Sequence, residues 1–458
     1  MIDVNNISYR DSAARVVKRG HTYSRYIFNE YKKEYDHLMD SGLYLELIEC
    51  GLLIQHKEIA LDSDDANVYK LLYPEQIPFQ AYPFEWTYSQ WRKAILSYLK
   101  INNIALKYGM ILKDASPFNF YLIRGKAVMF DTSSFIFFKE NDNWIAYRQF
   151  CEEFLSPVAL MYYNGADWSK LTIANIRGMQ LDFVSKQLPL RSWFNLTVLL
   201  NVHLHSKFIE KNKLEVQSKV KKAGFTLSKI KVLLKIIYDS INGWRIPYYS
   251  RDHWFKYYEN DIESPEYLVD KEIIIRNWLA KTKPGTILDL GANTGKFSFI
   301  AAEYTEKVIA LESVQKCIDE IENNIFIKNS DKIFTVLGNI AEPVPGLGLF
   351  NGETENIYKR CNSELVMGLG LIHHLFITNK LNYKQIVNLF VKFTSKYLII
   401  EFINVNDSKL QLIAFNSNFD LSNYNIDLFL NVLIEHFIIL EQRQILDSDR
   451  IILLLEKK

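Results

Sequence analysis

The sequence is poor in the features that mark secreted, zinc-bound or membrane proteins. Its four cysteines (Cys50, Cys151, Cys317 and Cys361) lie far apart and form no CxxC pair, which argues against a disulfide framework or a cysteine-based zinc site. The first twenty residues contain no signal-peptide core. The longest apolar runs are short or interrupted by His and Glu, so no membrane span is expected. These absences predict a cytoplasmic protein.

An excess of one charge is also missing. Lys and Arg number 54 and Asp and Glu 53, which leaves a formal charge of +1. Because polyanion binding depends on a positive field, no nucleic-acid partner is expected. The 48% of hydrophobic residues among 458 residues instead predicts a folded chain of two or three domains.

The order of predicted elements divides the chain into three parts. Residues 1–205 form a first domain, and residues 206–250 form a helical connector rich in lysine. From residue 251 to 458, short apolar strands alternate with helical segments, which predicts a mostly parallel α/β sheet covered on both faces. The last two strands are separated only by "LDSD", which predicts a terminal antiparallel hairpin.

A glycine-containing turn joins the first strand of this α/β region to its helix. In "ILDLGANTGKFS", Gly291 and Gly295 allow a ligand to approach the backbone closely. Asp289 ends the strand, and Glu312 ends the next strand. A carboxylate at the second position is placed to accept the two ribose hydroxyls of an adenosine ligand.

"LDLGANTG" resembles the first motif of class I S-adenosylmethionine-dependent methyltransferases, and the resemblance covers roughly the last 200 residues. It implies a Rossmann-type fold with a seven-stranded sheet and S-adenosylmethionine as cofactor. It also implies that Glu312 holds the ribose and that Asn339 contacts the adenine. The residues implied around the methionine part are Asp289, Gly291, Ala292, Asn293 and Gly295.

A further strand leads into "GLGLIHHL", which resembles the fourth motif of small-molecule methyltransferases. His374, or its neighbour His373, is a candidate general base or substrate-orienting group, because imidazole titrates near neutrality; packing against the following helix is the alternative. Glu401 ends the fifth strand at the crevice side of such a sheet. The aromatic residues Trp254, Phe255, Tyr257 and Tyr258 are candidates for covering the cofactor or for packing between domains.

The longer set "GNIAEPVPGLGLFNGE", "IHHL" and "IIEFINVND" is similar to a bacterial group of methyltransferases that includes nodulation-associated proteins. Methyl transfer to O or N of a small-molecule or glycan-type substrate is the implied reaction.

The first domain contains "DASPFNFYLIRGKAVMFD", in which Asp114 and Asn119 precede a hairpin and Asp131 follows it. This order resembles the catalytic loop and metal-binding Asp of protein kinases and small-molecule kinases. The resemblance implies an α+β kinase-like domain, with Asp114 as base and Asn119 and Asp131 as Mg²⁺ ligands for ATP. A shaped turn is the plain alternative for Asp114 and Asn119.

The kinase pattern is incomplete. No GxGxxG loop is present, "FDTSSF" lacks the glycine of a DFG motif, and only Lys32, Lys33 or Arg25 are candidates to reach phosphates. Three functional hypotheses remain open from the sequence. They are a methyltransferase with a kinase-like module for substrate or partner binding, a bifunctional kinase–methyltransferase, and a pseudoenzyme that acts as a protein-interaction module.

Overall fold

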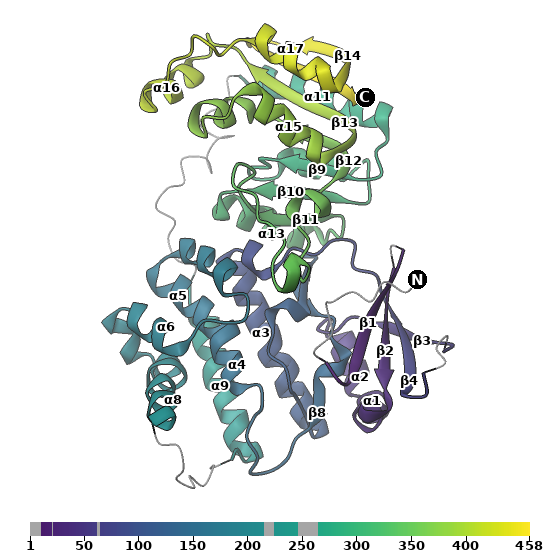
Figure 1. Ribbon diagram of the computed structural model, residues 1–458, viewed down its shortest axis with the longest axis vertical. Coiled ribbons are helices and arrows are strands. Elements are labelled where there is room, and N and C mark those ends of the chain that lie inside the picture. The colour runs from purple at the N-terminus through teal and green to yellow at the C-terminus, as the bar shows by residue number, and fades with distance from the viewer. Residues whose placement is uncertain (1–10, 21, 62–64, 215–223, 246–263) are drawn as a thin grey trace. The chain divides into compact units, whose positions relative to one another are not determined.

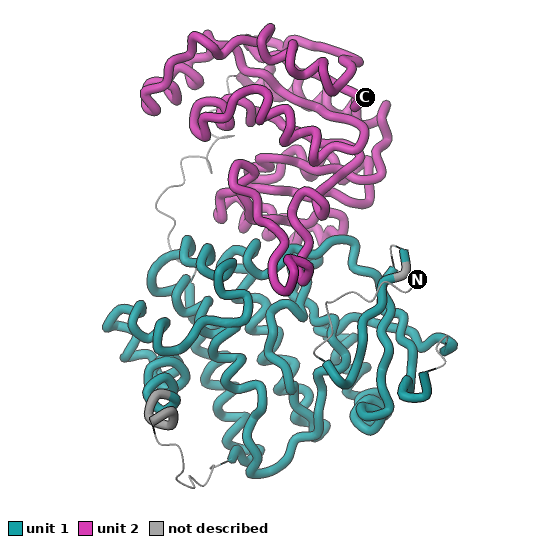
Figure 2. The backbone as a smooth tube through the Cα atoms, in the orientation of Figure 1, with its two compact units in different colours: residues 1–249 teal, residues 250–458 magenta. Residues whose placement is uncertain are grey.

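The computed structural model describes residues 11–20, 22–61, 65–214, 224–245 and 264–458. The chain divides into two compact units, Met1–Tyr249 and Ser250–Lys458 (Figure 2). Trp254, Phe255, Tyr257 and Tyr258, the aromatic residues singled out in the sequence, lie outside the described residues. Within the described ranges, no helix has both the length and the apolar character that a membrane crossing requires.

The first unit begins with a small antiparallel sheet in the order β1–β2–β4–β3, and two further strand pairs, β5–β8 and β6–β7, follow (Figure 1). Its strands are β1 (Ala14–Arg19), β2 (Thr22–Phe28), β3 (His56–Ile59), β4 (Val68–Pro74), β5 (Met110–Leu112), β6 (Phe120–Ile123), β7 (Lys126–Met129) and β8 (Phe135–Phe137). Its α-helices are α1 (Lys32–Asp40), α2 (Leu43–Glu49), α3 (Tyr88–Ala105), α4 (Tyr147–Gln149), α5 (Ser156–Asn164), α6 (Leu181–Gln187), α7 (Leu196–Val198), α8 (His205–Leu214) and α9 (Leu227–Gly243).

Helix α3 organises the helical part of the first unit. Thr87 and Gln90 form a capping box at its start: the Gln90 side chain accepts from the Thr87 N–H at 2.8 Å, and Thr87 Oγ1 accepts from the Gln90 N–H. Along the helix, Trp91 and Tyr98 are buried and contact the ring of Phe154. Aromatic packing therefore holds α3 against the segment that contains Phe154. Strands β5 and β7 contact the same helix α3.

Helix α9 lies within residues 206–250, the segment that the sequence predicted as a helical connector. Helix α9 packs against α3 and buries Ile230, Leu234, Ile237 and Ile241. The side chain of Arg92 donates to the carbonyl oxygens of Ile241 and Asn242, which secures the end of α9. The described part of this segment therefore belongs to the first unit.

The second unit contains one seven-stranded sheet in the order β11–β10–β9–β12–β13–β15–β14 (Figure 1). Neighbouring strands from β11 to β13 are parallel, and β15 is antiparallel to both β13 and β14. The predicted mostly parallel sheet with a terminal antiparallel hairpin is confirmed. The strands are β9 (Ile287–Leu290), β10 (Val308–Glu312), β11 (Ile333–Leu337), β12 (Ser363–Gly368), β13 (Thr394–Ile403), β14 (Phe437–Gln444) and β15 (Arg450–Lys457).

Helices cover both faces of this sheet. One face packs against α11 and α12 through Trp278 and Phe297, and against α13 through Ile321. The other face contacts α15 and α17. The α-helices of the unit are α11 (Pro265–Thr282), α12 (Lys296–Ala301), α13 (Gln315–Lys328), α14 (Ile357–Arg360), α15 (Tyr383–Phe393), α16 (Ser408–Asn416) and α17 (Ile426–His436). Because both faces are covered, the middle strands are apolar on both sides, as the sequence predicted.

Gly368, at the end of β12, tests the packing of α15 on the sheet. A Cβ atom at this position would lie 2.7 Å and 2.9 Å from two ring atoms of Phe390. We expect Gly368→Ala to lower the free energy of unfolding by about 1–3 kcal/mol, because overpacking strains a buried ring. Urea unfolding measures the change. Gly352→Ala is the matched control, since its Cβ would meet no atom closer than 3.5 Å; equal losses in both variants would contradict the prediction.

Candidate functional site

The loop between β9 and α12 lies at the carboxyl edge of the sheet and is held by its own backbone. The N–H groups of Gly291 and Ala292 both donate to the carbonyl oxygen of Leu311, at 2.9 Å and 3.2 Å. Gly291, Asn293 and Gly295 have positive φ angles of 73°, 50° and 85°. Glycine adopts such angles without the steric cost that a Cβ atom brings. A Cβ on Gly295 would lie 2.8 Å from Ile321, so the loop also packs tightly on α13.

The carboxylate of Glu312 joins this loop to the one after β10. One oxygen accepts from the N–H groups of Ser313 and Val314, at 2.6 Å and 2.9 Å, and lies 3.2 Å from the Ser313 hydroxyl. The other oxygen accepts from the Asn293 N–H at 2.9 Å. Four donors therefore surround a group with about four acceptor positions. Glu312 lies where the sequence predicted it, and it also shapes the glycine loop.

Asp289 lies on β9 behind the loop and is 2% exposed. Its carboxylate accepts from the Ser298 hydroxyl of α12 at 2.6 Å. The pKa of Asp289 is raised to about 6, mainly by burial and also by the nearby Glu312, while the Ser298 hydrogen bond and Lys271 act to lower it. A buried carboxyl of this kind favours a cationic ligand group beside it.

Asn339 follows β11 at the same edge of the sheet. The N–H of Gly338 donates to the Glu312 carbonyl at 2.9 Å, which sets the start of this loop beside β10. The side-chain oxygen of Asn339 accepts from the Ala341 N–H at 3.0 Å. Asn339 thus shapes its own turn, and its predicted contact with adenine stays a prediction.

The two histidines follow β12, with ring centroids 4.0 Å apart. Burial lowers the pKa of His374 to about 4, and burial, His374 and Arg450 lower the pKa of His373 still further. Both rings are therefore neutral at pH 7. A neutral imidazole with so low a pKa is a weak base, so hydrogen-bonded orientation of a substrate suits His374 better than full proton removal.

Glu401 of β13 is fully buried in a network of charges. Its carboxylate accepts from the Tyr267 hydroxyl and from Lys271 Nζ, each at 2.7 Å, and lies 3.8 Å from the Arg450 guanidinium. Burial by itself raises the pKa of Glu401, but Lys271 and Arg450 outweigh burial and lower it. Arg450 also binds Asp407 at 3.0 Å. Glu401 is thus held by several partners in this structure, and its predicted role in catalysis stays a prediction.

The sequence analysis missed Tyr267, Lys271 and Arg450. Tyr267 and Lys271 are four residues apart and so share a face of α11, where Lys271 is only 6% exposed. Arg450 precedes the apolar run "IILLL" of its strand. A charge directly before such a run was the available signal, but the sequence does not show its partner Tyr267, 183 residues earlier in the chain.

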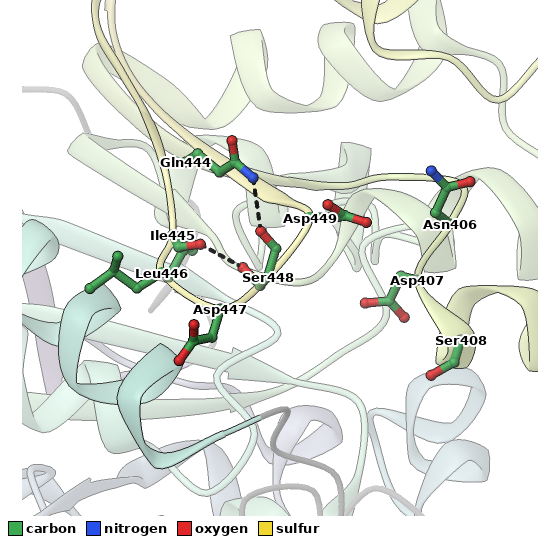
Figure 3. A pocket seen from close by; sticks show the side chains of 9 residues that line it. All are labelled: Asn406, Asp407, Ser408, Gln444, Ile445, Leu446, Asp447, Ser448 and Asp449. Atoms are coloured by element: carbon green, nitrogen blue, oxygen red, sulfur yellow. Dashed lines mark hydrogen bonds between the residues drawn. The ribbon is translucent and has the colours of Figure 1, made fainter.

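A hollow of about 690 Å³ opens at the ends of β13 and β14 (Figure 3). Its lining is mostly polar: Asn406, Asp407, Ser408, Gln444, Ile445, Leu446, Asp447, Ser448 and Asp449. Asp407 connects the hollow to Arg450, and Arg450 donates to Tyr267 at 3.1 Å. Polar groups that line an open hollow at this edge suit a ligand with hydroxyl or amine groups.

The first unit brings Asp114, Asn119 and Asp131 into one region. The β6–β7 hairpin sets Asn119 beside Asp131, since the Phe130 N–H donates to the Asn119 carbonyl at 3.0 Å. The Asn119 side-chain amide donates to Asp114 at 2.9 Å. Burial and the charge of Asp131 raise the pKa of Asp114. The three residues thus form a cluster, as their spacing suggested.

Asp131 of this cluster forms an ion pair with an arginine of the same unit. The Arg25 guanidinium of β2 donates to its carboxylate, and the side chains of both residues are about one-tenth exposed. Burial by itself raises the pKa of Asp131, but Arg25 and hydrogen bonds from Ser133 and Ser134 lower it to about 2. Of the three cations considered for phosphate binding, Arg25 is the one that reaches the cluster through Asp131.

Comparison with curated proteins gives one relative of similar length. The chain is 25% identical over 383 residues to the nodulation protein NoeA of Rhizobium meliloti (strain 1021), which covers 82% of this chain and 79% of that protein. An alignment of this length extends beyond either unit alone. It supports the nodulation-associated group suggested by the sequence motifs. No model of a known protein family matches the chain.

Solved structures of methyltransferases resemble part of the chain. The N-methyltransferase NodS from Bradyrhizobium japonicum WM9 is 11% identical, with 43% of this chain and 99% of that chain covered and a TM-score of 0.32. Magnesium protoporphyrin IX methyltransferase (ChlM) from Synechocystis PCC 6803, with bound SAH, is 14% identical, with 45% and 94% covered and a TM-score of 0.33.

The pKa of Asp289 predicts a pH-dependent stability. Because its folded-state pKa of about 6 lies above the ordinary 3.8, the folded state takes up the proton first, so stability rises as the pH falls from about 7.5 to about 5. Asp289→Asn cannot titrate, and we expect it to lose about 1–2 kcal/mol of this rise. Urea unfolding at both pH values measures it. The exposed Asp427→Asn is the control; identical pH profiles for the two variants would refute the assignment.

Proposed function

We propose that this protein is an S-adenosylmethionine-dependent methyltransferase that acts on O or N of a small-molecule or glycan-type metabolite. The observation that carries the proposal is the meeting of Asp289, the glycine loop and Glu312 at the carboxyl edge of the sheet. In open α/β sheets, ligands bind at this edge, where the strand order reverses. The reversal in this sheet lies between β9 and β12.

The residues at this edge fit the cofactor's chemistry. Gly291 and Gly295 adopt positive φ angles that let the backbone of the loop approach a ligand closely, while Asp289 and Glu312 supply carboxylates for an ammonium group and a ribose diol. Asn339 offers an amide to the adenine. The bound cofactor supplies an activated methyl group on a cationic sulfur. The protein then has mainly to align the acceptor atom with the methyl group. In favourable cases such alignment lowers the activation barrier by about 7–11 kcal/mol.

The acceptor side is proposed at the turn after β12 and the polar hollow. His374 is proposed as an uncharged group that orients a hydroxyl or amine, because burial lowers its pKa to about 4. The buried network of Tyr267, Lys271, Glu401 and Arg450 keeps the wall of the crevice fixed, because any shift would separate buried charges. Hydroxyl, amide and carboxylate groups in the hollow favour a polar acceptor.

The first unit is proposed as a kinase-like module that binds the substrate or a partner. Support comes from the order of its elements: an antiparallel sheet with two helices between β2 and β3, a long helix α3, and a hairpin flanked by acidic residues. A second candidate, a bifunctional kinase–methyltransferase, depends on Mg²⁺ at Asn119 and Asp131. The ion pair between Arg25 and Asp131 speaks against that candidate.

Cofactor binding tests the proposal directly. Titration calorimetry should detect S-adenosylmethionine binding to the full chain, and Glu312→Gln should weaken it at least about tenfold, because an amide replaces two acceptor oxygens by one. Glu306→Gln, on an exposed side chain of the same unit, should bind as the wild type does. Circular dichroism verifies that each variant is folded. No binding by the wild type would end the methyltransferase proposal.

His374→Ala separates orientation from packing. We expect transfer of labelled methyl groups to hydroxyl- and amine-bearing sugars to fall about tenfold to a hundredfold, because an oriented hydrogen-bonding partner is lost. The cofactor dissociation constant should not change. The control is His436→Ala, at the end of α17. An unchanged transfer rate would assign His374 to packing alone.

A further inference from the structure

The acidic cluster of the first unit is closed by a cation from the chain itself. Arg25 extends from β2, and Asp131 follows β7, 106 residues later. The guanidinium that binds Asp131 also lies 3.3 Å from the hydroxyl of Ser133. Because Arg cannot be deprotonated in a protein, this positive charge is permanent.

Few acceptor positions remain on Asp131. One carboxylate oxygen faces Arg25, accepts from the Ser133 N–H at 3.0 Å, and lies 2.7 Å from the Ser133 hydroxyl. The other accepts from the Ser134 hydroxyl. A carboxylate oxygen that binds a divalent cation presents a lone pair directly to the ion. On the oxygen facing Arg25, these three groups occupy that space.

The other members of the cluster have hydrogen-bond partners of their own. The side-chain NH₂ group of Asn119 donates to one Asp114 oxygen, and the other Asp114 oxygen accepts from Gln149 at 2.6 Å. Lys113 is paired with Asp11. Mg²⁺, which a kinase-like unit implies, does not fit beside Asp131 while Arg25 is bound to its carboxylate.

We propose that Arg25 takes the place of a divalent cation at Asp131, so that the first unit binds its ligand without Mg²⁺ or Mn²⁺. The guanidinium supplies the positive charge that Asp131 requires, and it does so before any ligand arrives. A site built in this way favours a ligand that needs no metal bridge, rather than a metal–nucleotide complex. The proposal does not depend on methyl transfer, because it concerns the first unit alone.

Mn²⁺ alone is the probe, added to the full-length protein without cofactor. We expect calorimetry and electron paramagnetic resonance to detect no site that depends on Asp131 in the wild type. Arg25→Met removes the charge and keeps an apolar stem of similar length. It should acquire a site that binds Mn²⁺ at least about tenfold more tightly than the wild type, and its melting temperature should rise with Mn²⁺.

Two variants control the measurement. Arg15→Met removes an exposed arginine from the neighbouring strand β1 and should leave Mn²⁺ binding unchanged. Arg25→Met combined with Asp131→Asn should lose the acquired site. A folded Arg25→Met protein without an acquired site would overturn the proposal.

The wild type provides a test that does not depend on the folding of Arg25→Met. Mn²⁺ binding by the wild type that disappears in Asp131→Asn would overturn the proposal. Its absence in both proteins supports the proposal, with Mn²⁺ titration of a chelator as the positive control for detection.

Discussion

The carboxylate of Glu312 is the interaction on which the geometry of the candidate crevice depends. It accepts hydrogen bonds from the loop after β10 and from Asn293 in the glycine loop, so one side chain holds together two loops from neighbouring strands. Without it, the N–H groups of both loops would lose this acceptor, and a hydrogen bond to a charged group contributes about 1.5–3 kcal/mol. The ribose-binding role proposed for Glu312 therefore builds on a structural role: a ligand that reaches this carboxylate replaces or shares bonds that already shape its own site.

Three buried acids in this protein differ because their neighbours differ. Asp289 has a hydroxyl partner, and burial raises its pKa to about 6. Glu401 and Asp131 are also buried, but a lysine and an arginine face Glu401 and an arginine faces Asp131, and their pKa values are lowered despite burial. Of the three, Asp289 is the one whose carboxylate accepts from a hydroxyl group of the neighbouring helix α12. An acid of that kind is well suited to a ligand that brings a positive charge.

Local patterns in the sequence predicted much of the second unit. Alternating apolar strands and helices predicted the parallel sheet, and "LDSD" predicted the turn between β14 and β15. The contacts that set the chemistry join distant segments and could not be predicted. Arg25 donates to Asp131, which lies 106 residues later in the sequence, and Arg450 donates to Tyr267, which lies 183 residues earlier. The sequence analysis weighed the many lysines of residues 206–250 and overlooked the apolar face of α9. That face is buried, and α9 belongs to the first unit.

Both units use a buried arginine to hold an acid in place, but with different consequences. In the second unit, Arg450 and Lys271 tie Glu401 and Asp407 into the wall of a crevice whose other carboxylates, on β9 and β10, face a glycine loop. The fixed charges there stiffen a site that keeps its ligand-binding groups. In the first unit, Arg25 binds the acid that a kinase-like site would need for its metal. An arginine thus neutralises an acid in each unit: Arg450 binds Asp407 at the edge of the sheet in the second unit, and Arg25 binds Asp131 within the acidic cluster of the first.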